Sequence, residues 1–204
     1  LRRLDTDYIV IDLGAGTSYN TVDFFLLADS QLMVVIPEPT SIENAYRFIK
    51  NSFFRQIFHN SQNFGLKSVV TPILRKDNPY NVNTPKELIN YLNKLGGSTT
   101  VFIEEQLQLF NPKIILNQVR TERDQLVGPA MKTACSKYFN LNMKFTGNIS
   151  EDESVRKSVL DRKPLAVAYP DGVPMQQLKS ICANILQEET ERSAKNNLLS
   201  QLAL

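Results

Sequence analysis

An aspartate and two glycines end the first apolar run of the chain, in the stretch DLGAGTS at residues 12–18. The carboxylate of Asp12 can hold magnesium, usually through a water molecule. Glycine amides can approach a terminal phosphate without a steric conflict. These residue types therefore suit the metal and phosphate end of a nucleotide site. The alternative is a tight turn in which Asp12 only caps the next helix.

Three later apolar runs also end in polar residues that can bind a nucleotide. Glu38 lies between Pro37 and Pro39, directly after the run MVVI. Asn117 ends the run IIL, and its carboxamide can pair with both a donor and an acceptor on a base edge. The loop GNISEDES, residues 147–154, offers polar main chain to the same base.

Each of these loops also has a purely structural explanation. Glu38 can be a solvated glutamate in a rigid surface loop, and Asn117 can end a strand in a turn. Ser150 can cap the helix that follows it. The order of the four loops along the chain, with an acid and glycines first, then Glu, then Asn, then a capped loop, favours a nucleotide site more than any one of them does.

Short apolar runs alternate with longer helical periods, which predicts an α/β fold with a mostly parallel sheet flanked by helices. Strands are predicted at residues 8–13, 31–37, 112–119 and 143–150. Open sheets of this kind bind ligands at the carboxyl ends of their strands. The four loops would then meet at one edge of the sheet.

Helical periods cover most of the rest of the chain. Helices are predicted at 21–29, 40–60, 65–76 (kinked near Pro72), 81–97, 99–110, 122–139 (interrupted at Gly128–Pro129), 151–161 and 174–193, with an extended piece at 164–170. Capping pairs are predicted at Thr40 and Glu43, at Thr84 and Glu87, and at Ser150 and Glu153. We expect a single domain over residues 1–204, with a helical excursion from the sheet at 63–111.

Composition excludes several function classes. A net charge of +2 is too small to indicate nucleic-acid binding, and no apolar run reaches the length of a membrane span. The single histidine, His59, makes Ser–His–Asp and Cys–His catalysis poor candidates. Cys135 and Cys182 are far apart and not part of a CxxC, which favours buried thiols in a reduced, cytoplasmic protein over a disulfide or a metal pair.

These residues together resemble the MinD/ParA family of ATPases, within the P-loop NTPases. DYIVIDLGAGTS resembles the strand and switch II of that family, and MVVIPEPTSIENAYRFIK resembles its next strand and Pro-Glu loop. IILNQVR resembles the adenine-reading strand end, and GNISEDESVRKSVLDRKPL the loop and helix that close over the base. The likeness covers about residues 7–50 and 112–190. Within the family, the first two segments look most like the MinD-like proteins that control flagellar number and placement.

The resemblance implies a role for each matching residue. Asp12 would be the magnesium-associated acid, and Gly16 would offer its amide to the terminal phosphate of ATP. Glu38 matches a glutamate that reaches the nucleotide of the other subunit in family homodimers, and Asn117 would read adenine. The residues expected to line the base pocket are Ile149, Ser150 and Asp152.

The sequence departs from the family pattern at three points. Family members often have proline where Ser150 stands, and some have aspartate where Asn44 stands, which puts the base pocket and the details of pairing in doubt. The third departure is the glycine-rich phosphate loop with its lysines, because LGAGTS lacks the lysine that reaches the phosphates. We therefore expect the chain to be a fragment that binds ATP weakly or not at all and associates with another copy or with the remaining part of its parent.

Three functions remain open from the sequence. The first is an ATP-dependent dimerisation switch that engages a protein partner, in which the intact parent is the ATPase and this chain alone is inactive. The second is a non-catalytic interaction module that binds its partner through residues 63–111. The third and weakest is an iron–sulfur scaffold on the same fold. The tail NLLSQLAL, residues 197–204, gives weak support for peripheral membrane contact.

Overall fold

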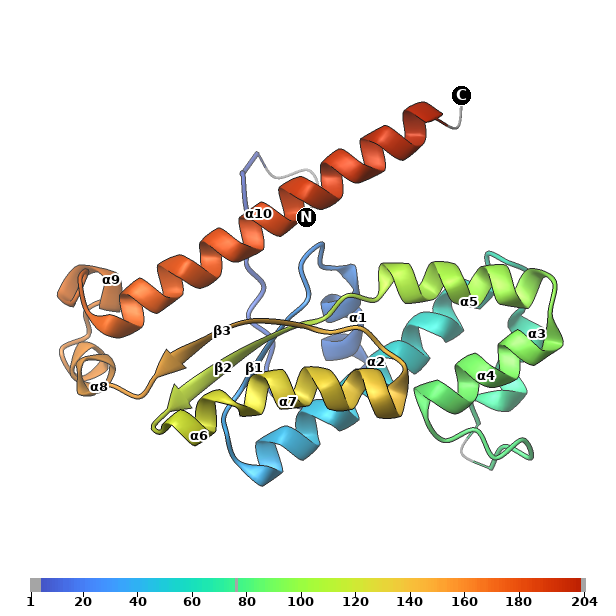
Figure 1. Ribbon diagram of the computed structural model, residues 1–204, viewed down its shortest axis with the longest axis horizontal. Helices are drawn as coiled ribbons and strands as arrows, with labels where there is room; N and C mark the ends of the chain where they lie inside the picture. Colours follow the sequence, from blue (N-terminus) through green and yellow to red (C-terminus); the bar gives the residue numbers. More distant parts are fainter. Residues whose placement is uncertain (1–4, 76, 203–204) are drawn as a thin grey trace.

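The computed structural model describes residues 5–75 and 77–202, and side chains of the last helix through Glu191. The fold is α/β: three parallel strands in the order β1-β2-β3 form a small sheet with helices on both faces (Figure 1). The elements follow the chain as α1 (Tyr19–Leu27), β1 (Leu32–Val35), α2 (Pro39–Ser61), α3 (Lys67–Ile73), α4 (Pro85–Leu95), α5 (Ser98–Leu109), β2 (Lys113–Val119), α6 (Glu122–Gln125), α7 (Val127–Ala134), the π-helix η1 (Cys135–Phe139), β3 (Lys144–Ser150), α8 (Glu153–Leu160), α9 (Leu165–Ala168) and α10 (Val173–Leu202).

Three of the four predicted strands are confirmed as β1, β2 and β3, and their pairing is parallel as predicted. The prediction of a strand at residues 8–13 is wrong. That segment is extended, but within the described residues no strand pairs with it, and its apolar side chains reach solvent: Tyr8 is 73% exposed and Val10 93%. A strand needs a neighbour for its backbone hydrogen bonds, and the apolar run alone does not supply one.

The two faces of the sheet are covered by different helices. Met33 and Val35 of β1 and Ile114 and Leu116 of β2 point to the face that α2 and α7 cover, and all four are buried. The opposite face packs against α10, which runs along β3 and extends beyond the sheet (Figure 1). That helix leaves β1 uncovered, so Val34 is 63% exposed.

A β-bulge changes the face to which β3 directs its side chains. The register shifts between Ile114 and Ile115, which pair with Phe145 and Gly147. Phe145 therefore contacts α7, where a Cβ on Gly128 would lie 2.2 Å from its ring, whereas Gly147 contacts Ile181 of α10. The bulge thus turns Phe145 and Gly147, which regular alternation would place on one face, toward opposite covering layers.

Residues 63–111 form a helical excursion, as predicted, made of α3, α4 and α5 packed on α2. Thr84 and Glu87 make the predicted capping box at the start of α4, and Gly96 ends the helix with a φ of 70°. A buried amide network joins the excursion to α2: Gln56 Nε2 donates to the main-chain oxygen of Gln106 at 2.9 Å, and Asn60 Nδ2 donates to the side-chain oxygen of Gln106 at 2.6 Å.

Two predicted helix caps are wrong. Helix α2 begins at Pro39, so Thr40 lies inside its first turn, and Glu43 pairs with Arg47 instead. Ser41 in the same turn accepts the N–H of Ile36 at 3.2 Å, which ties the loop after β1 to the helix.

Helix α8 is capped by Asp152, whose Oδ1 accepts the N–H of Ser154 at 2.7 Å. Ser150 is the last residue of β3. The pattern S-x-x-E was misleading, because the strand extends through its serine.

Two helical segments also differ from the prediction. The break in 122–139 falls at Leu126, and Gly128 and Pro129 lie in the first turn of α7, where proline is tolerated. Residues 164–170 contain the short helix α9, not an extended piece.

The closing helix was predicted to end at residue 193 but continues to Leu202. Within the described residues, none of the helices has the length and apolar composition that a bilayer span requires. The side chains of the leucine-rich tail at 197–204 lie outside the described residues.

Candidate functional site

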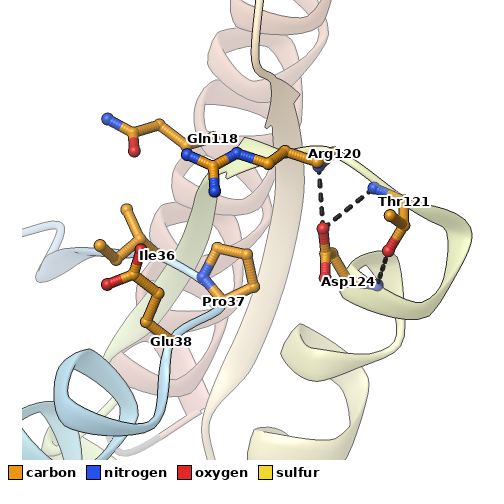
Figure 2. A pocket seen from close by; sticks show the side chains of 7 residues that line it. All are labelled: Ile36, Pro37, Glu38, Gln118, Arg120, Thr121 and Asp124. Carbon is orange, nitrogen blue, oxygen red and sulfur yellow. Dashed lines mark hydrogen bonds between the residues drawn. The ribbon is translucent and has the colours of Figure 1, made fainter.

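A pocket of about 220 Å³ opens at the carboxyl ends of β1 and β2 (Figure 2). It is lined by Ile36, Pro37, Glu38, Gln118, Arg120, Thr121 and Asp124. The volume lies below the roughly 300–1,000 Å³ of pockets that hold drug-sized ligands. A group the size of a base or another small polar fragment fits it better than a whole nucleotide does.

The floor on the β2 side is built by the capping box of α6. Asp124 Oδ2 accepts the main-chain N–H groups of Arg120 and Thr121, both at 2.9 Å, and Thr121 Oγ1 accepts the N–H of Asp124 at 3.2 Å (Figure 2). These backbone donors, with that of Arg120 first, hold the pKa of Asp124 below its ordinary value. Asp124 is therefore a carboxylate committed to the loop, and it fixes the place where Arg120 leaves the strand.

Arg120 joins the loops that follow two strands. Its Nε pairs with Oε2 of Glu151, and its Nη2 donates to Oε1 at 3.3 Å. This carboxylate raises the pKa of Arg120, and the charge of Glu38 adds to the effect. The guanidinium reaches over Pro37 (Figure 2). One cation thus connects the loop after β3 with the pocket between β1 and β2.

The end of β2 has an unusual backbone. Gln118 has a φ of 56°, which is uncommon for a residue that is not glycine. The side chain of Asn117 supports the turn by accepting the N–H of Gln118 at 2.9 Å on Oδ1. Such conformations persist where surrounding contacts hold them, and they concentrate at binding sites.

The structure brings several predicted site residues to this edge of the sheet. Glu38 lines the pocket, whereas half-buried Asn117 directly precedes the lining residue Gln118 and is not itself part of the lining. Val119 of β2 pairs with Ser150, so Ile149, Ser150 and Asp152 lie at the same edge, beside β2. The loops after β1, β2 and β3 therefore meet at one edge, which we call the rim, as the parallel topology predicts.

Two of the predicted base-pocket residues have structural contacts. Ser150 donates its N–H to Gln177 Oε1 at 2.7 Å and accepts Gln177 Nε2–H on Oγ at 2.9 Å. Asp152 caps α8 through Ser154, which lowers its pKa. Both can still line a pocket, but their polar side-chain atoms are already engaged.

Asp12 and Gly16 are not joined to the rim. The Asp12 side chain is exposed, and within the described residues it makes no hydrogen bond or ion pair with the pocket. Gly16 has a φ of 125°, which suits glycine, and a Cβ there would meet only open space. Over the described residues no group of three or more His, Cys, Asp or Glu could hold a metal ion. Of the ligands expected for magnesium, only the exposed carboxylate of Asp12 is present among the described residues. One carboxylate does not by itself form a magnesium site.

Four pocket residues were missed from the sequence: Gln118, Arg120, Thr121 and Asp124. Thr121 and Asp124 have capping-box spacing, which could have marked the start of α6. The left-handed backbone of Gln118 and the pairing of Arg120 with Glu151, 31 residues away, leave no local signal.

Comparison of the chain with models of protein families and with curated proteins found no match.

Proposed function

We propose that this chain carries the base-binding rim of a nucleotide switch of the MinD/ParA kind, in which ATP with magnesium drives homodimerisation and hydrolysis reverses it. One observation supports the proposal most: Glu38, which follows β1, and Asn117 and Ser150, which are among the last residues of β2 and β3, lie along one rim beside a small pocket. Open α/β sheets bind nucleotides at this position.

The chemistry of the rim suits a purine base. Asn117 Nδ2 makes no hydrogen bond to a described residue, so the carboxamide keeps a donor for a ring nitrogen, and Oδ1 has a second lone pair for an exocyclic amine. Glu38 offers an acceptor from the next loop. Asp12 and Gly16 would contribute to the magnesium and phosphate end only as part of a larger donor set, which a lysine-bearing glycine loop elsewhere in the parent would complete. We expect the parent to act in cytoplasmic organisation, such as flagellar placement, division or partition.

The decisive experiment measures ATP binding and hydrolysis with magnesium by the intact parent and by this chain, side by side. We expect slow turnover by the parent, loss of turnover in Asp12→Ala, and binding by this chain that is much weaker than that of the parent but still detectable through amide shifts. Wild-type turnover in Asp12→Ala would refute the switch.

A second function is favoured by a separate observation. The outer edge of β1 has no partner strand among the described residues, and Val34, Tyr8 and Val10 expose large apolar side chains. Such surfaces favour association with protein. A non-catalytic interaction module predicts association of this chain without nucleotide, measured by sedimentation equilibrium. The coding sequence upstream of this chain in the parent gene separates the two functions. The switch requires a lysine-bearing glycine loop there, and the non-catalytic module does not.

A further inference from the structure

We propose that Gln177, on the C-terminal helix α10, is the residue that positions the rim of the binding site. The inference rests on the proposed function of that rim. It extends that function because α10 contributes no residue to the pocket lining, yet would fix the position of the residues at the rim.

Gln177 uses both ends of its carboxamide on one residue. Its Oε1 accepts the Ser150 N–H at 2.7 Å, and its Nε2 donates to Ser150 Oγ at 2.9 Å. Both residues are half-buried, so the bonds are shielded from competing water. Two bonds from one planar group fix the position and the orientation of the last residue of β3.

The position of Ser150 determines the wall of the pocket. The next residue, Glu151, donates its N–H to Val119 O at 3.0 Å and pairs through its carboxylate with Arg120. Arg120 is exposed and lines the pocket, so its side chain is directed mainly by this carboxylate, while the α6 cap fixes its backbone. A displacement of Ser150 would move Glu151 and release the guanidinium.

Gln177 is itself held in place along the helix. One face of α10 follows β3 and is anchored twice more: Asn184 Nδ2 donates to Thr146 O at 3.1 Å, and Glu189 pairs with the buried Lys113 at 2.6 Å. Ile181, which is buried, packs on Gly147 between Gln177 and Asn184 along the helix. The register of α10 on β3 is thus fixed from the rim to the opposite end of the sheet.

The test compares Gln177→Leu with Gln177→Glu in this chain. Glutamate can still accept the Ser150 N–H, and the Ser150 hydroxyl can rotate to donate to its second oxygen, whereas leucine removes both bonds. Gln187→Leu is the matched control, because Gln187 is on the same helix and, among the side chains that the structure describes, bonds to exposed Glu191 and not to the sheet.

Hydrogen exchange by NMR is the first readout and needs no ligand. In Gln177→Leu we expect the Ser150 amide and the Arg120 Nε–H to exchange roughly tenfold faster, with Ile115 in the centre of β2 unchanged. Gln177→Glu and Gln187→Leu should keep wild-type rates at all three positions. Wild-type exchange at Ser150 and Arg120 in Gln177→Leu overturns the inference, and so does faster exchange everywhere, which would indicate a merely structural role.

The second readout is titration with adenosine, and with guanosine for comparison, followed by amide shifts at residues 117–121 and 149–152. We expect adenosine to shift these amides in the wild type and in Gln177→Glu, and to lose its preference over guanosine in Gln177→Leu. Retained preference in Gln177→Leu contradicts the inference. If adenosine shifts nothing in the wild type, the proposed function fails, while exchange still decides whether Gln177 positions Ser150 and Arg120.

Discussion

Lys113 Nζ lies 2.6 Å from Glu189 Oε1 and donates to Ser30 Oγ at 2.7 Å, although the lysine side chain is only 1% exposed. Glu188 Oε2 stands 3.9 Å from the same nitrogen and 3.1 Å from Lys144 Nζ. A buried cation at the start of β2 is thus neutralised by two carboxylates of α10, each about a quarter exposed. The arrangement is asymmetric, because only the lysine is cut off from water.

The asymmetry predicts unequal costs of removing the partners. In Glu188→Gln/Glu189→Gln the lysine charge stays buried without a counter-charge, and we expect a loss of roughly 3 kcal/mol in the free energy of unfolding. In Lys113→Met the carboxylates turn to solvent, and the cost should stay under about 1 kcal/mol. Urea unfolding of both variants measures the difference. Equal destabilisation would show that the lysine is needed for more than its charge balance.

Gly128 predicts a packing constraint between α7 and β3. A Cβ there would lie 2.2 Å and 2.4 Å from ring atoms of Phe145. We expect Gly128→Ala to cost about 1–3 kcal/mol because the ring must move within a packed layer. Gly14→Ala is the control, since nothing lies within 4 Å of a Cβ at that position.

A double-mutant cycle tests whether the ring is the cause. Phe145→Leu alone should destabilise the chain, but in its presence Gly128→Ala should cost much less. Thermal or urea unfolding of the wild type, the two single variants and the double variant measures the costs in unfolding free energy. Additive costs would contradict the contact between residue 128 and the ring.

The parallel sheet could be predicted because β1, β2 and β3 are short apolar runs separated by strong helical periods. The strand expected at 8–13 has the same apolar pattern, but a strand depends on a partner, and the pattern does not report one. Helix caps were also predicted correctly where their contacts are local in sequence and wrongly where a distant residue intervenes. Thr84 and Glu87 were found because every contact of a capping box lies within four residues. At Ser150 the same spacing misled, because a contact with Gln177, 27 residues later, holds that serine at the end of β3.

The candidate site shows this limit most clearly. Glu38 and Asn117 could be predicted to lie near this edge because strand ends in a parallel sheet share an edge. The residues that shape the pocket, Gln118 and Arg120, were not found. A left-handed backbone is uncommon for glutamine, and the ion pair joins Arg120 to Glu151, 31 residues along the chain, so the spacing of residues indicated neither.

Stability in acid should depend on the capping box of α4. Main-chain N–H groups of Asn83 and Thr84, at 2.7 Å and 2.9 Å, hold the pKa of Glu87 below its ordinary value. A lowered carboxyl pKa stabilises the folded state above the unfolded value of about 4.3 and loses that contribution as pH falls through the folded value. Glu87→Gln should therefore flatten the fall of unfolding free energy below about pH 4. The matched control is Glu104→Gln on α5, for which an unchanged slope is expected. A wild-type slope in Glu87→Gln would contradict the assignment.

The two cysteines should differ sharply in reactivity. Burial raises the pKa of Cys135 to about 12, whereas Cys182 is exposed on α10, contrary to the prediction that both thiols are buried. A thiolate is the reactive form, so a chromogenic disulfide reagent should label one thiol of the native chain quickly. In the denatured chain the reagent should label two thiols quickly. In Cys182→Ser the fast phase should vanish, and rapid labelling of that variant would mean that the η1 region opens readily.

Asn117 offers the sharpest test of base recognition at the rim. In Asn117→Asp the carboxylate can still accept the Gln118 N–H, so the strained turn should survive, but the Nδ2 donor is lost. A base nitrogen would then face a negative charge, and adenosine affinity should fall by roughly tenfold or more. Asn93→Asp, an exposed position on α4, makes the same charge change away from the rim and should bind as the wild type does. Amide shifts during adenosine titration measure all three proteins. Equal affinity in the two variants would remove Asn117 from the site, because the only difference between them is the place of the lost donor.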